Sequence, residues 1–248
     1  MKKTDFPKDI LSVIDKIEKE AKPVSIFIYG SRARDDFKED SDYEVGAIFA
    51  RAKRWERREL AQLHNNPNIN IYSFVLEEIE RYIIDTPFPK AVYLKELVEE
   101  SITVSGENII QKLMPPQIKL SDLIEVIIFE TSYALGALLS ARKNDLVTAS
   151  IQFTKAVLFA ARALVILELG KFPLTHKDIY EQSKKLKFLD ANGSIVIDYA
   201  MDVRNGKTID QEMIYKSLRF LNQSAYTRIK NQLKTGDRII LPGHPLFE

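Results

Sequence analysis

The stretch IFIYGSRARDDFKEDSDYEVGAIF, residues 26–49, decides how the first half of this chain folds. Its two apolar ends predict two buried strands, and Gly30 and Ser31 form the turn after the first of them. Asp42 and Glu44 open the second strand. Because side chains alternate faces along a strand, these two carboxylates point the same way, two rises of about 3.3 Å apart.

Two carboxylates at this spacing repel each other strongly unless a cation lies between them. Oxygen ligands beside a Gly-Ser turn indicate Mg²⁺ that holds a polyphosphate, so we predict Asp42 and Glu44 as metal ligands. Gly30 would let the backbone approach a phosphate closely. Ser31 would offer its hydroxyl and its backbone N–H to the phosphate oxygens.

Arg32 and Arg34 follow the turn and are predicted to counter the charge of the polyphosphate, since a guanidinium binds phosphate through two parallel donors. Each of these features alone has a commoner explanation, as a plain turn, a solvated acid or a surface arginine. The joint pattern of strand, Gly-Ser, arginine, polar spacer and Ser-Asp-x-Glu favours a nucleotide site.

Composition excludes several other classes of protein. The chain has 248 residues, which is ample for a core, and a net charge of +1, so no global field attracts nucleic acid or an anionic membrane. It has no cysteine, which excludes disulfides and thiolate zinc sites, and its three histidines are scattered. No apolar run of 18 residues lacks a charge. We therefore expect a cytoplasmic protein with no membrane partner and no clear nucleic-acid partner.

The periodicity of the chain changes at Met114-Pro115-Pro116, because tandem prolines cannot continue a helix. Before this point we predict a helix over 10–21, a third strand over 69–75, and helices over 51–63, 76–84 and 90–100. After it we predict helices over 120–142, 146–169, 177–187, 195–203 and 209–233. The expected fold is α+β, with a small mixed-sheet domain over 1–115, an all-α bundle over 118–235, and a tail over 236–248 that packs on the body.

Gly30-Ser31 and Ser41-Asp42-Tyr43-Glu44 together resemble the signature of the DNA polymerase β-like nucleotidyltransferase superfamily. Within it the chain looks closest to the kanamycin nucleotidyltransferases, which use this Ser-Asp-x-Glu form. The resemblance implies transfer of a nucleoside monophosphate from an NTP to a hydroxyl acceptor, with Mg²⁺ or Mn²⁺ and release of pyrophosphate. It also implies a homodimer.

Three further positions are compared with that family. Asn70 stands where the family has a third carboxylate and is either a neutral metal ligand or a strand-edge amide. Glu130 matches the family's general base and is otherwise a surface charge or part of an ion pair. Ala134 stands where the family has a phosphate-binding lysine.

These departures leave a second function open, which is a catalytically weakened nucleotide-binding or interaction protein that retains the nucleotidyltransferase fold. The helical half is also similar to HEPN-type domains. The ribonucleases of that group carry a histidine a few residues after an arginine near a late helix. After Arg204 no histidine occurs before His244, which disfavours RNA cleavage.

Overall fold

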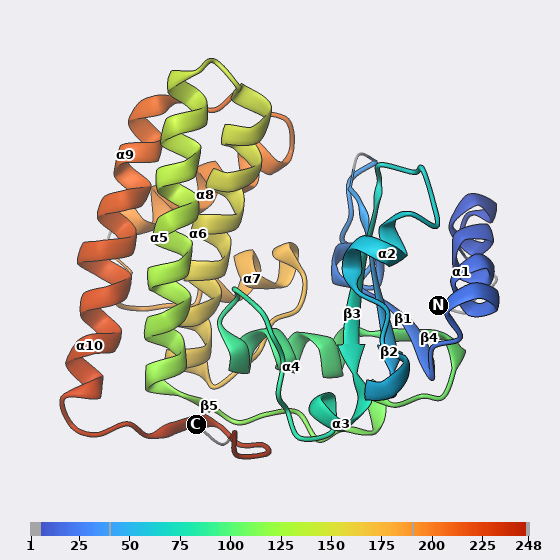
Figure 1. Ribbon diagram of the computed structural model, residues 1–248. Coiled ribbons are helices and arrows are strands. Elements are labelled where there is room, and N and C mark those ends of the chain that lie inside the picture. Colours follow the sequence, from blue (N-terminus) through green and yellow to red (C-terminus); the bar gives the residue numbers. More distant parts are fainter. Residues whose placement is uncertain (1–5, 40, 190, 247–248) are drawn as a thin grey trace. The chain divides into compact units, whose positions relative to one another are not determined.

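The computed structural model describes residues 6–39, 41–189 and 191–246, and the chain divides into two units, whose elements are labelled in Figure 1. The first unit comprises the chain up to Pro116 together with the residues from His244 onward. The second unit comprises Gln117–Gly243. The ends of the predicted first domain and of the predicted tail, 1–5 and 247–248, lie outside the described residues.

A four-stranded mixed sheet forms the centre of the first unit. Its strands are β1 (Ser25–Tyr29), β2 (Tyr43–Phe49), β3 (Ile69–Val75) and β4 (Ile102–Gly106), arranged in the order β3-β2-β1-β4. β1 is antiparallel to both β2 and β4, whereas β2 and β3 are parallel. This sheet and the helices that follow it confirm the predicted α+β fold.

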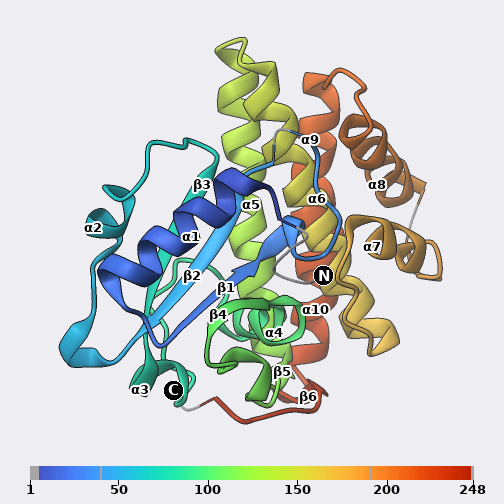
Figure 2. The same cartoon turned by 90° about the vertical axis from the view of Figure 1, so that its right-hand side faces the viewer.

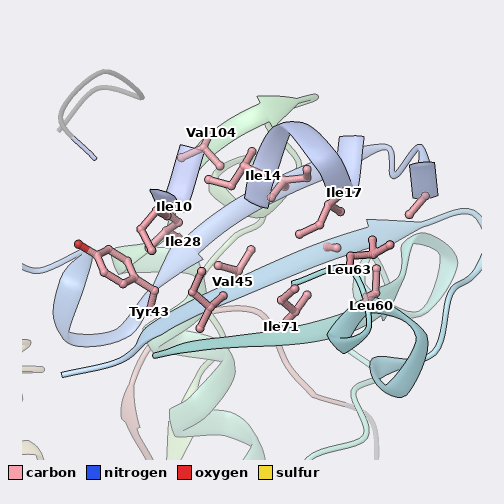
Figure 3. Packing of buried hydrophobic residues seen from close by; sticks show 14 of the residues in the cluster. Ile10, Ile14, Ile17, Ile28, Tyr43, Val45, Leu60, Leu63, Ile71 and Val104 are labelled. Carbon is pink, nitrogen blue, oxygen red and sulfur yellow. The ribbon is translucent and has the colours of Figure 1, made fainter. Parts of the chain in front are cut away.

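One face of the sheet is covered by α1 (Lys8–Ala21), which lies across the strands in Figure 2. Ile10, Ile14 and Ile17 recur at helical spacing and are buried, as predicted from their period. Figure 3 shows them packed on side chains from the strands, such as Ile28 and Val45. This apolar layer fixes the strands that carry the acidic residues.

The opposite face of the sheet packs against α4 (Lys90–Glu100), whose Leu94 and Leu97 are buried with Phe27 of β1. Short elements complete this unit: α2 (Arg57–Ala61), α3 (Leu76–Ile79), and 3₁₀ turns at 30–32, 51–53 and 110–112. The predicted helices over 51–63 and 76–84 are therefore wrong in length. α2 begins late because the side chains of Glu56 and Glu59 form a capping box at its start.

The second unit is helical. It contains α5 (Leu120–Arg142), α6 (Leu146–Leu169), α7 (His176–Ser183), α8 (Ala191–Arg204), α9 (Gln211–Arg219) and α10 (Thr227–Leu233). A π-helical segment, Phe220–Tyr226, separates α9 from α10, where the sequence pattern predicted one uninterrupted helix. The strands β5 (Ile118–Lys119) and β6 (Ile239–Leu241) pair with each other beside the start of α5.

α5 and α6 are long and apolar enough to cross a membrane by length and hydropathy alone. Core helices of soluble proteins meet the same criteria. In α6, 72% of the most apolar window is buried within the protein. The two helices are therefore weak evidence for membrane insertion.

Candidate functional site

The strand register places the acidic residues on one face of the sheet. Glu44 in β2 lies directly opposite Tyr29 in β1 and directly beside Asn70 in β3. Residues paired in this way point to the same face. Asp42 lies just before β2, and its carboxylate Oδ2 accepts a hydrogen bond from the side-chain amide of Asn70. Asp42, Glu44 and Asn70 thus form one polar group, here called the acid cluster.

Gly30 brings the turn after β1 up to this cluster. Its φ is +74°, in the left-handed region that favours glycine. A Cβ atom at this position would lie 1.9 Å from Oε2 of Glu44. The backbone and the carboxylate therefore approach each other more closely than any other residue would allow. Ser31, the next residue of this turn, is half-buried.

Arg32 holds the loop that leads to Asp42. Its guanidinium donates hydrogen bonds to the carbonyl oxygen of Ser41, at 2.6 and 3.1 Å, and to that of Glu39, at 3.0 Å. It also lies over the ring of Tyr43, with 4.6 Å between the guanidinium carbon and the ring centroid. The Ser41 hydroxyl accepts a hydrogen bond from the backbone N–H of Lys38 at 2.9 Å. The donors of Arg32 predicted for phosphate are thus directed at backbone carbonyls.

Arg34 points into the first unit and forms an ion pair with Glu100 of α4. The two side chains are only 9% and 1% exposed, so this pair is buried. Burial by itself lowers the pKa of Arg34, but the neighbouring carboxylate of Glu100 raises it above its ordinary value. Arg34 is therefore positioned to hold the turn against α4, a role that the sequence pattern did not predict.

Three tyrosines lie beside the acid cluster and were missed by the sequence reasoning. The Tyr93 hydroxyl of α4 donates a hydrogen bond to the Tyr29 hydroxyl at 3.1 Å, and the rings of Tyr29 and Tyr72 are 6.0 Å apart. Burial raises the pKa of all three hydroxyls, and the charge of Glu44 raises it further. A signal was available for two of them, since Tyr29 precedes Gly30 and Tyr72 follows Asn70 at strand spacing.

Arg57, at the start of α2, also belongs to this face. Its guanidinium carbon lies 4.5 Å from the ring centroid of Tyr72. The positive charge of Arg57 lowers the pKa of the Tyr72 hydroxyl, whereas Glu44 and Asp42 raise it. A side-chain hydrogen bond from Arg57 lowers this pKa as well, so Arg57 and the two carboxylates have opposite effects on the same hydroxyl group.

Glu130, the predicted base, lies on α5 of the second unit and is 4% exposed. Ala134, one turn further along α5, is fully buried. Arg162 of α6 is buried too, with its guanidinium over the rings of Phe159 and Phe172. The role of Glu130 stays a prediction.

The donor set of the acid cluster consists of two carboxylates and one amide. Within the described ranges, no group of three or more histidine, aspartate or glutamate side chains is arranged to hold a metal ion. The carboxylates of Asp42 and Glu44 nevertheless supply the oxygen donors that Mg²⁺ and Mn²⁺ prefer. This chemistry fits a divalent cation.

No family model and no curated protein matches the chain. Among solved structures, the chain is similar to spectinomycin adenyltransferase AAD(9) from Enterococcus faecialis, solved with ATP and spectinomycin. The TM-score is 0.56, with 13% identity, and the match covers 89% of this chain and 99% of that one. A nucleotidyltransferase-like protein from Exiguobacterium sibiricum 255-15 matches at 14% identity, over 92% of this chain and 81% of that one. Its TM-score of 0.31 is too low to indicate a shared fold.

The likeness to the adenyltransferase shows that this chain shares the fold of that protein, in agreement with the fold predicted from the sequence. At 13% identity it shows the fold alone. The closer resemblance to kanamycin nucleotidyltransferases stays a prediction.

Proposed function

We propose that this protein is a nucleotidyltransferase that transfers a nucleoside monophosphate from an NTP to a hydroxyl acceptor and releases pyrophosphate. One observation carries the proposal: the carboxylate of Glu44 lies against the Gly30 turn, on the face where Asn70 binds Asp42. The likeness to an adenyltransferase solved with ATP supports it.

Asp42 and Glu44 would hold the metal ion, Mg²⁺ or Mn²⁺. When bound, such an ion neutralises phosphate charge and polarises the phosphoryl oxygens. Without it, two neighbouring carboxylates would repel a triphosphate. We therefore expect nucleotide affinity to depend on the divalent cation.

The remaining residues of the site orient the reactants. The Asn70 amide restricts the carboxylate of Asp42, and the absence of a side chain at Gly30 lets the carboxylate of Glu44 lie against the turn. Ser31 supplies a hydroxyl donor. Catalysis would come mainly from fixed positions and fixed charges. The acceptor hydroxyl must lose its proton, and from the family resemblance we propose Glu130 as the base.

The direct test is release of pyrophosphate from each of the four common NTPs, in Mg²⁺ and in Mn²⁺, with a panel of hydroxyl-bearing acceptors that includes spectinomycin and kanamycin. We expect the variants Asp42→Asn and Glu44→Gln to lose activity about 100-fold or more, because each removes a charge at the reacting phosphate. Glu18→Gln, on the exposed side of α1, is the matched control. Absence of pyrophosphate under every condition would contradict the proposal.

A second candidate is a nucleotide-binding protein without turnover. The observation that favours it is Asn70, whose amide donates to Asp42 where a third acid is expected. Calorimetry separates the two candidates, since the second requires metal-dependent NTP binding with no pyrophosphate release.

We also propose a homodimer in the cytoplasm, from the resemblance and the composition. Light scattering on the purified protein tests the oligomeric state.

A further inference from the structure

The acid cluster and a bound triphosphate together carry more negative charge than one divalent cation neutralises. The two arginines of the turn are poorly placed to supply the missing positive charge. Arg32 donates to the carbonyl oxygens of Ser41 and Glu39, and Arg34 is paired with Glu100 in the interior. Withdrawing either guanidinium would leave buried or half-buried partners without their hydrogen bonds.

Arg57 is better placed. It is exposed, and its guanidinium carbon lies 4.5 Å from the centroid of the Tyr72 ring. Tyr72 follows Asn70 by two residues in β3, so its side chain is on the same face of the sheet as the acid cluster. The ring of Tyr72 also lies 6.0 Å from that of Tyr29, which is paired directly with Glu44.

The contact with Tyr72 gives Arg57 a defined position without using its donors on a carboxylate. The side chain of Arg57 also hydrogen-bonds the Tyr72 hydroxyl, and a guanidinium has five N–H donors, so further donors remain for another ligand. Such a group binds phosphate through paired charge-assisted hydrogen bonds. The electrostatics agree, since Arg57, Glu44 and Asp42 all act on the Tyr72 hydroxyl.

We propose that Arg57, held on the ring of Tyr72, binds the β- and γ-phosphates of the NTP and the pyrophosphate that leaves. This inference rests on the proposed function, because it adds a residue to the same site. In this assignment Arg57 takes the part for which the sequence offered Arg32 and Arg34. It would also supply a phosphate-binding cation to a chain that has Ala134 at the family's lysine position.

The test is calorimetry on the full-length protein in Mg²⁺ at constant ionic strength. The probes are inorganic tripolyphosphate, the four common NTPs, and the matching nucleoside monophosphates. The variants are Arg57→Gln and Arg58→Gln, which remove the same charge from neighbouring exposed positions of α2. Thermal unfolding of both variants checks that the fold is intact.

We expect Arg57→Gln to weaken binding of tripolyphosphate and of NTP about tenfold or more, while Arg58→Gln changes it by about twofold or less. Binding of the monophosphates should be the same in both variants. Equal effects of the two substitutions, or an equal loss for the monophosphates, would overturn the assignment. If the wild-type protein binds neither tripolyphosphate nor any NTP, the proposed function itself fails, and this inference fails with it.

Discussion

Replacement of Gly30 by alanine tests whether the contact between the turn and Glu44 is what builds the site. The left-handed φ of +74° alone should destabilise the fold by about 1–2 kcal/mol for a residue with a Cβ. The second effect of the substitution is a steric clash with Glu44. The new Cβ would lie 1.9 Å from Oε2 of Glu44, whereas ordinary contacts begin at 3.4 Å, so the carboxylate must retreat by about 1.5 Å. A displacement of this size at a reacting centre lowers turnover by about 100-fold.

Gly170 provides the matched control for this substitution. It ends α6 with a φ of +59°, and nothing lies within 4 Å of the position its Cβ would take. Gly170→Ala should therefore show the backbone strain alone, a loss of about 1–2 kcal/mol with normal pyrophosphate release. A double-mutant cycle with Glu44→Ala isolates the clash, because Gly30→Ala should be less destabilising when the carboxylate is absent.

The assays are urea unfolding, pyrophosphate release, and calorimetry with Mg-NTP. If Gly30→Ala retained the wild-type affinity and turnover, the close approach of Glu44 to the turn would be irrelevant to function, and the reasoning above would be refuted. If Glu44→Ala left the destabilisation by Gly30→Ala unchanged, the clash with the carboxylate would contribute nothing to the loss of stability.

Three other predictions concern charges near or outside the site. Burial raises the pKa of Asp122 from 3.8 to about 6, so the stability that protonated Asp122 contributes is present at low pH and lost as the pH rises through 6. Relative to the variant Asp122→Asn, the wild-type protein should lose about 1–2 kcal/mol of unfolding free energy between about pH 4 and 6. Urea unfolding at a series of pH values measures this loss. Glu100→Gln should destabilise the protein by about 3 kcal/mol, because Arg34 is left buried without its counterion; an unchanged urea midpoint would show that the pair is not buried in solution. Asn70→Asp sets a third carboxylate against Asp42, so the melting temperature should fall in EDTA and rise more with Mn²⁺ than in the wild type; a fall with no extra gain in Mn²⁺ would argue against a metal at this position.

Local patterns in the sequence carried the prediction of the fold. The i, i+4, i+7 spacing of Ile10, Ile14 and Ile17 and the alternation around Glu44 depend only on residues close together in the chain. The place of Asn70 beside the acidic pair came instead from the family resemblance, because the register of β2 and β3 joins residues far apart in the chain.

The residues that Arg34 and Arg57 contact could not be predicted from local sequence patterns. Arg34 pairs with Glu100, 66 residues further along the chain, and nothing local distinguishes it from a surface arginine. In the sequence, Arg57 is one of several consecutive charged residues and cannot be distinguished from them. Its contact with Tyr72 is what assigns it to the site. Side-chain roles that depend on tertiary neighbours are therefore the part of the site that sequence patterns leave open.

The division of the chain into units bears on how the protein is made in the cell. His244 stacks on Tyr82 at 4.2 Å, its backbone N–H donates to the carbonyl of Pro115, and Leu246 packs in the sheet core of the first unit. Translation delivers these residues after the helical unit has been synthesised. The first unit therefore receives part of its core from residues that follow the helical unit in the chain, so its packing is completed only after that unit has been synthesised.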